Sequence, residues 1–161
     1  MKIAFYIVLA AIVLALVAAQ VGLLSGQRPA ELGVKDGRLK PPSVTRNSVS
    51  SQAALLPDHP QRAYASIEAL PFKAGGAAAS MKALESVLAT MPGLTFIEQR
   101  TDYICAQAQT RWLKFVDDVE FWANPASGAI EVRSASRLGR EDFGVNRQRI
   151  ETIRAAYLAA P

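Results

Sequence analysis

The stretch that decides the fold is LKFVDDVEFWANPASGAIEVRSASR, residues 113–137. Residues 113–122 and 129–137 carry β-branched and aromatic residues in the two-residue alternation that is typical of strands. Between them, NPASG at 124–128 supplies the Asn, Pro, Ser and Gly of a turn. The sequence therefore predicts a β-hairpin centred on this turn.

Two of the three carboxylates in the first strand have cationic partners on the second. With the hairpin centred on its turn, Glu120 faces Arg133, and Arg137 lies diagonally from Asp118 within reach of its side chain. Opposite charges across a strand pair stabilise it by about 0.2–1 kcal/mol. A divalent metal would need further oxygen ligands at the same point, and two arginines would repel it. We therefore interpret these four residues as a structural ion ladder, and we expect no metal and no cofactor.

The third carboxylate, Asp117, lies on the opposite and otherwise apolar face of the same strand. A carboxylate is costly to bury unless it is paired or hydrogen-bonded. Either Ser136, which faces it across the hairpin, or an arginine of the C-terminal segment satisfies it, or its pKa is shifted for a function. The face with Asp118 and Glu120 is mixed in polarity, so we expect that face to be the more exposed.

The segments around the hairpin complete an α+β pattern. Residues 94–100 and 103–109 are typical of two further strands, and residues 66–72 are typical of a short strand or an extended edge that Pro71 ends. Apolar residues at three- and four-residue intervals predict helices at 76–91 and at the C-terminus. We therefore predict a mainly antiparallel four-stranded meander with helices packed on one face.

An apolar run occupies the N-terminus, from Ile3 to Leu24, and only Gln20 and Gly22 interrupt it. At 1.5 Å per residue it spans roughly 33 Å as a helix, which is enough to cross the hydrocarbon core of a bilayer. A cleaved signal peptide has a shorter apolar region. We predict a transmembrane anchor over residues 1–24, with a cleaved signal as the alternative.

Two further segments follow the anchor. Residues 25–60 are rich in Pro, Gly, Ser and Asn and show no period, which predicts an extended linker. Residues 61–161 then form the compact domain. Residues 1–56 hold six Lys and Arg against two Asp and Glu, whereas residues 57–161 hold twelve of each. The neutral domain argues against nucleic acid as a partner, because the basic patch of such a protein lies on the domain itself.

The charges flanking the anchor do not agree with its expected direction. Lys2 precedes it, and four Lys and Arg between 28 and 40 lie after it, so the positive-inside rule would keep the domain in the cytoplasm. Short N-terminal anchors usually export the domain behind them. We expect a single-pass protein of the inner membrane with the domain on the periplasmic side, and the cytoplasmic side stays open. The single Cys105 excludes an intramolecular disulfide and does not decide the side.

Signals for catalysis are few. The chain has no P-loop, dinucleotide fingerprint, zinc spacing or nucleophile elbow. His59 lies in the linker without an orienting partner, and we interpret Trp112 and Trp122 as partly buried core residues. An anion site is physically reasonable at the start of the C-terminal helix, where Asn146 and Arg147 come after Gly144.

With these residues in view, the chain resembles domain-of-unknown-function family 1499. The matching segments are DGRLKPPSVTRNSVSSQ at 36–52, FVDDVEF at 115–121 and RSASRLGREDFGVNRQRIETIR at 133–154. Members of the family typically have cysteines at the positions of Pro42 and Ser48, which implies a disulfide that this chain lacks. The resemblance implies a membrane-linked α+β domain and no particular activity. It also draws attention to Ser134 and Gly144, beside the acidic and basic residues named above.

These observations lead to two functions of different kinds. The first is a membrane-anchored, non-catalytic module of the cell envelope that binds a protein partner or a small anion. The alternative is a hydrolase that uses the carboxylate of Asp117. The candidate binding residues are Asp117, Arg133, Ser136, Arg137, Asn146 and Arg147. A weaker hypothesis is assembly at the membrane surface, with the basic residues of the linker against anionic lipid.

Overall fold

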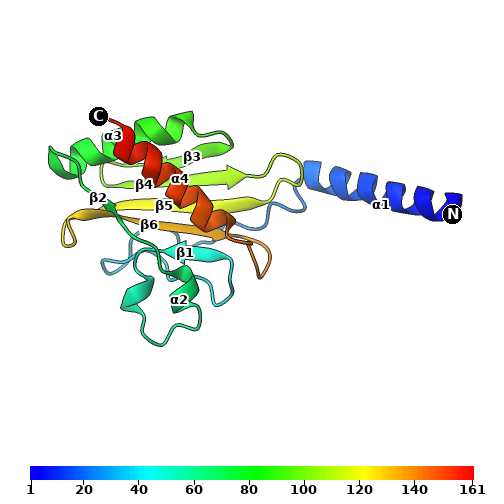
Figure 1. Cartoon of the computed structure of the whole chain (residues 1–161), viewed down its shortest axis with the longest axis horizontal. Helices are drawn as coiled ribbons and strands as arrows, with labels where there is room; N and C mark the ends of the chain where they lie inside the picture. The colour runs from blue at the N-terminus through cyan, green and yellow to red at the C-terminus, as the bar shows by residue number, and fades with distance from the viewer.

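The computed structural model describes residues 1–161 and has an antiparallel sheet with helices on one of its faces (Figure 1). The strand order is β1-β6-β5-β4-β3, and the short β2 also pairs with β6. The helices are α1 (Lys2–Gln20), α2 (Arg62–Ala65), α3 (Gly76–Thr90) and α4 (Val145–Ala159), with a 3-10 turn at Ala53–Leu55. The strands are β1 (Ser48–Ser50), β2 (Leu70–Pro71), β3 (Leu94–Gln99), β4 (Tyr103–Gln109), β5 (Val116–Asn124) and β6 (Ala129–Ser136).

The α+β class is confirmed, but the sheet has six strands and not four. The two additional strands are β1, which is three residues long, and β2, which is two residues long. β2 lies within residues 66–72, where the sequence predicts a short strand or an extended edge, whereas β1 is too short for an alternation to show in the sequence. β1 lies within the segment 25–60 that we expected to be an extended linker. That segment also buries Leu39, Val49 and Ala53, so much of it belongs to the folded domain.

The register of the central hairpin is confirmed. Glu120 pairs with Arg133, and Asp117 pairs with Ser136. Gly128 closes the turn with φ of 66°, and its N–H donates to the carbonyl of Asn124 at 3.0 Å. Glycine adopts this left-handed backbone conformation without steric cost, which explains its place at the end of NPASG.

One face of the sheet is covered by α3 and α4, and the main hydrophobic core lies between this face and the two helices. Leu84 and Leu88 of α3 and Ile153 of α4 are at most 1% exposed, and they belong to one cluster with Phe121 of β5. Full burial of such side chains stabilises a fold by about 1.5–3 kcal/mol each. This face corresponds to the helix layer that the sequence predicts.

The other face is covered by an irregular segment, residues 26–42, which we call the strap (light blue in Figure 1). Its Leu39 packs in a second cluster with Tyr103, Cys105 and Trp122. Our expectation that this face is the more exposed of the two is therefore wrong, since Glu120 on it is 0% exposed and Asp117 on the other face is 6% exposed. The strap has no apolar period, so the sequence does not reveal that it covers a sheet.

The N-terminal helix α1 leaves one end of the sheet along the long axis of the molecule (Figure 1). It is the one helix that is long and apolar enough to cross a membrane, with a mean hydropathy of 2.6. Most of its side chains are exposed, but Ala19 in its last turn is fully buried. The end of α1 is therefore seated against the domain.

Two buried ion networks and a cationic cavity

Asp117 is held by an ion pair on the helix-covered face of the sheet. Its Oδ2 lies 2.6 Å from Nη2 of Arg149 on α4, and the aspartate is 6% exposed. Arg149 also donates from Nη1 to Ser134 Oγ at 3.0 Å and to Asn146 Oδ1 at 2.8 Å. An arginine of the C-terminal segment thus satisfies this carboxylate, which is one of the three outcomes that the sequence left open.

Asn146, at the start of α4, joins the helix to the sheet. Its side chain is fully buried, and its Nδ2 contacts Asp142 Oδ2 at 2.8 Å, Ser136 Oγ at 3.0 Å and the carbonyl of Asn47 at 3.2 Å. Buried polar groups are costly when unpaired. Asn146 therefore fixes the position of α4 on β6 through its partners.

The anion position at the N-terminus of α4 is filled by the protein's own carboxylate. Asp142 accepts hydrogen bonds from the N–H groups of Gly144 at 2.9 Å and Asn146 at 3.2 Å, and from the hydroxyl of Tyr64. Burial alone would raise the pKa of Asp142, but these hydrogen bonds outweigh it and lower that pKa. Burial and the bond to Asp142 raise the pKa of Tyr64 to about 12.

Arg147 points away from this network. Its Nη2 donates to the carbonyls of Tyr64 at 2.5 Å and Ser66 at 2.9 Å. It therefore ties α4 to the segment that precedes β2. An anion site built from Gly144, Asn146 and Arg147, which the sequence left as a possibility, does not assemble at this helix end.

The strap-covered face holds a second network, centred on Glu120. Its Oε2 lies 2.9 Å from Arg133 Nη1, and its Oε1 accepts from the hydroxyl of Tyr103 and the N–H of Gly33, each at 2.8 Å. Burial, followed by the charge of Glu120, raises the pKa of Tyr103. Through Gly33, the buried carboxylate on β5 fastens the strap to the sheet.

The remaining groups of this face are also paired or buried. Arg137 binds Asp118 with two hydrogen bonds, Nε to Oδ2 at 2.9 Å and Nη2 to Oδ1 at 2.7 Å. The hydrogen bond to Asp118 raises the pKa of Arg137. Cys105 is fully buried, and burial raises the pKa of its thiol. Nε of Arg133 is buried without a partner.

The six candidate binding residues thus do not form one site. Asp117 and Ser136 lie on the sheet face under α4, where Asn146 of α4 contacts Ser136. Arg133 and Arg137 lie on the opposite face of the sheet, and Arg147 contacts Tyr64 and Ser66 instead. The alternation of side chains along a strand already separates Asp117 and Ser136 from Arg133 in the sequence. Asp117 and Ser136 face each other across the hairpin and share one face, whereas Arg133 faces Glu120 on the other face.

A cavity of about 250 Å³ opens between the strap and the end of β1, and we call it the strap cavity. Its outer wall is a hairpin turn at Asp36 and Gly37, with φ of 51° and 71°. The N–H and carbonyl groups of Lys35 and Arg38 are mutually hydrogen-bonded across this turn at 2.8 and 3.0 Å. Both central residues have positive φ, as in the type I′ turn that Asp-Gly favours.

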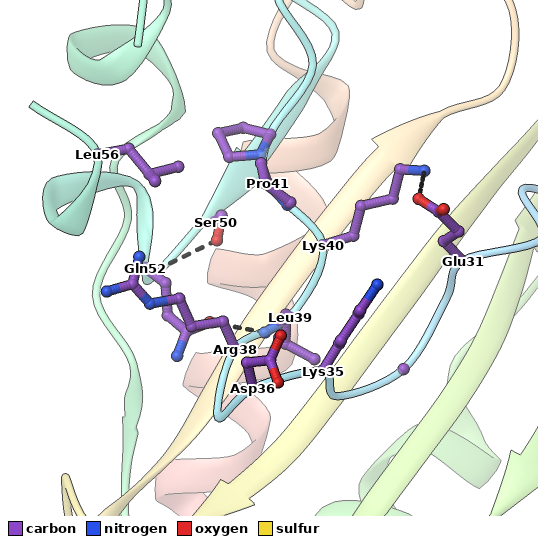
Figure 2. A pocket seen from close by; sticks show the side chains of 12 residues that line it. Glu31, Lys35, Asp36, Arg38, Leu39, Lys40, Pro41, Ser50, Gln52 and Leu56 are labelled. Atoms are coloured by element: carbon purple, nitrogen blue, oxygen red, sulfur yellow. Dashed lines mark hydrogen bonds and ion pairs between the residues drawn. The ribbon is translucent and has the colours of Figure 1, made fainter. Parts of the chain in front are cut away.

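The strap cavity combines cations with apolar walls (Figure 2). Three cations (Lys35, Arg38 and Lys40) and two carboxylates (Glu31 and Asp36) line it, and the remaining lining consists of Gly33, Leu39, Pro41, Pro42, Ser50, Gln52 and Leu56. Gln52 secures the inner wall, because its Oε1 accepts the N–H of Leu39 at 2.8 Å. Lys40 has a loose contact of 3.8 Å to the exposed Glu31.

The cations of the turn are free of protein partners. Neither Lys35 nor Arg38 belongs to any of the ion pairs in the structure, and neither side chain donates a hydrogen bond to the protein. Sequence reasoning missed this cavity, although the Asp-Gly pair between Lys35 and Arg38 was a readable turn signal.

Comparisons with known proteins identify the chain by family alone. Neither the curated proteins nor the solved structures that were searched include a significant match. A family model described as protein of unknown function (DUF1499) matches residues 38–157, which contain β1 to β6, α3 and most of α4. The match covers well over half of the sequence, and the chain therefore belongs to the DUF1499 family.

Proposed function

We propose that this protein is a membrane-anchored, non-catalytic module of the cell envelope that binds a small organic anion in the strap cavity. The observation that carries the proposal is the pair of unpartnered cations, Lys35 and Arg38, opposed across one turn at the cavity. Like charges directly opposite each other destabilise a strand pair. The carboxylate of Asp36 in the same turn offsets part of this repulsion, and a bound anion would supply the partner that each of the two cations lacks.

The walls of the cavity indicate what kind of anion would fit. Leu39 and Leu56 and the rings of Pro41 and Pro42 offer apolar surface beside the cations. Binding sites for small molecules combine such walls with a few polar groups that fix orientation. A volume of about 250 Å³ is below the usual range for drug-sized ligands, which favours a short carboxylate or phosphate ester with an apolar part.

The ion networks support a structural role for the three carboxylates of β5, Asp117, Asp118 and Glu120. The carboxylate of Asp117 is paired with Arg149, and the hydroxyl of Ser136 lies against Asn146. A second, open groove lies between the end of α3 and the first turns of α4, with Met91, Leu94 and Arg149 in its lining. Neither Asp117 nor Ser136 lines this groove or the strap cavity. This arrangement favours the binding module over the hydrolase that the sequence left as an alternative.

The location that we propose is the inner membrane, with α1 as the anchor and the domain on the periplasmic side. The resemblance to the family implies cysteines at positions 42 and 48. Here the N–H of Ser43, directly after Pro42, donates to Ser48 Oγ at 2.7 Å, so the two positions are neighbours in space. A disulfide there in relatives would fit an oxidising compartment.

Thermal unfolding of the detergent-solubilised full chain tests the ligand. The panel contains phosphate, succinate, octanoate and a nucleotide, and a ligand present at 100 times its dissociation constant stabilises the native state by about 2.7 kcal/mol. We expect octanoate or another amphiphilic anion to raise the midpoint, and the double variant Lys35→Gln/Arg38→Gln to abolish the shift.

Lys82→Gln is the matched control, because Lys82 is an exposed cation on α3 outside the cavity. It should keep the full shift. A shift that survives in the double variant would place the ligand elsewhere and contradict the site. A panel without any shift would contradict the small-anion proposal and favour a protein partner, to be captured by crosslinking in the membrane.

A further inference from the structure

The loop between β4 and β5 exposes large apolar side chains. Its sequence is RWLK, from Arg111 to Lys114. Trp112 is 66% exposed and Leu113 is 38% exposed, with a cation on either side of the pair. Our expectation that Trp112 is partly buried in the core is therefore wrong, whereas Trp122 is 9% exposed and belongs to the second cluster.

The loop is closed by hydrogen bonds at its base. The N–H of Thr110 donates to the carbonyl of Phe115 at 3.0 Å, and the N–H of Phe115 donates to Thr110 Oγ1 at 2.9 Å. The guanidinium of Arg111 lies 5.1 Å from the centroid of the Trp112 ring. Trp112 and Leu113 are thus held at the tip of a short, closed loop, and neither belongs to one of the two hydrophobic clusters.

This tip lies beside the end of α1 (Figure 1). Gln20 Nε2 donates to the carbonyl of Trp112 at 3.3 Å, next to the fully buried Ala19. The strap is packed just as closely behind the helix, since a Cβ added to Gly26 would lie 2.7 Å from Cβ of Arg137. If α1 crosses a bilayer, its end brings the loop to the surface of that bilayer.

We propose that the loop of residues 110–115 inserts into the boundary between headgroups and acyl chains of the membrane that α1 crosses. Tryptophan is enriched at this boundary because its ring is apolar and its indole N–H is polar. Leu113 would enter the acyl region beside it, and Arg111 and Lys114 would reach the lipid phosphates from their apolar stems. The proposal rests on the anchoring role of α1 within the proposed function.

Tryptophan fluorescence of the full chain in vesicles tests this insertion. The variant Trp122→Phe leaves Trp112 as the only tryptophan, and the vesicles contain phosphatidylcholine and phosphatidylglycerol. We expect phosphatidylcholine brominated near the glycerol end of its acyl chains to be the strongest quencher of the emission, as for a ring at the interface. Bromine near the methyl end and acrylamide in the water should quench it weakly.

A matched control moves the tryptophan to the far end of the domain. The triple variant Trp112→Phe/Trp122→Phe/Leu158→Trp puts the ring at a position of α4 that is 56% exposed and distant from α1 (Figure 1). We expect acrylamide to quench this ring strongly and the brominated lipid to have no effect.

Carbonate extraction of the same vesicles separates the two claims. If the protein resists extraction but acrylamide quenches Trp112 as strongly as the control, α1 is inserted and the loop proposal is overturned. If carbonate removes the protein, the anchoring role fails and the loop proposal fails with it. Resistance to carbonate together with quenching by the shallow bromine supports both.

Discussion

Replacing Glu120 by glutamine should destabilise the domain strongly. Glu120 is 0% exposed and the Arg133 side chain is 5% exposed, so the pair is removed from water. Glutamine keeps the shape but removes the charge, which leaves the guanidinium of Arg133 buried without a counter-ion. Breaking a buried pair in this way costs about 3–5 kcal/mol. The loss is a large part of the roughly 5–15 kcal/mol by which domains are typically stable.

Chemical unfolding of the full chain in detergent measures this loss. The near-ultraviolet circular dichroism band of the buried Trp122 reports the domain, because α1 contains Phe5 and Tyr6 but no tryptophan. The double variant Glu120→Gln/Arg133→Met should recover part of the lost stability, because it removes the uncompensated buried charge, while the amide oxygen of the glutamine can still accept from Tyr103 and Gly33.

Glu151→Gln is the control for a pair of the same two residue types. Its partner Arg154 lies three residues away on α4, and the Glu151 side chain is 48% exposed. Such pairs contribute at most about 1 kcal/mol, so this variant should stay close to the parent. A loss of the same small size for Glu120→Gln would refute the reasoning, since the buried pair would then behave like an exposed one.

Three further predictions concern the ion networks. Because the native pKa of Asp142 lies below its ordinary value of 3.8, the stability that Asp142 contributes is present above pH 3.8 and is lost as the pH falls through the native pKa. In Asp142→Asn, the unfolding midpoint should therefore fall less steeply as the solution is made acidic. An equally steep fall in the variant and the parent would contradict this. Asn146→Ala should cost about 2–3 kcal/mol in chemical unfolding, because it strips partners from Ser136 and Arg149; a cost below about 0.5 kcal/mol would show that the helix is held otherwise. The thiol of Cys105 should react with maleimide only after unfolding, because it is fully buried and its pKa is raised. Rapid labelling of the native protein would show that the strap does not cover this face of the sheet.

The sequence predicted the parts of the fold that repeat a local pattern. The alternation on both sides of NPASG determined the pairing of Glu120 with Arg133 and of Asp117 with Ser136. The helix over α3 was readable in the same way, from its apolar residues at three- and four-residue intervals.

The parts that the sequence did not predict depend on contacts between distant segments. The strap covers a sheet face with single residues such as Leu39 and with the N–H of Gly33, and a backbone donor leaves no mark in a sequence. Arg149, and not the hydroxyl of Ser136, satisfies the carboxylate of Asp117, because the rotation of α4 on the sheet decides which arginine reaches it. The strap cavity was missed for the same reason, since its two walls lie on segments whose packing has no local pattern.

An ¹H–¹⁵N spectrum of the isotope-labelled full chain in micelles, titrated with octanoate and with phosphate, tests the central claim most directly. The account predicts that the amide signals of Gly33, Lys35, Leu39 and Gln52 shift together and saturate, because these groups surround or secure the strap cavity. Shifts gathered instead at Gly144 and Asn146, or no saturable shift with either anion, would contradict it.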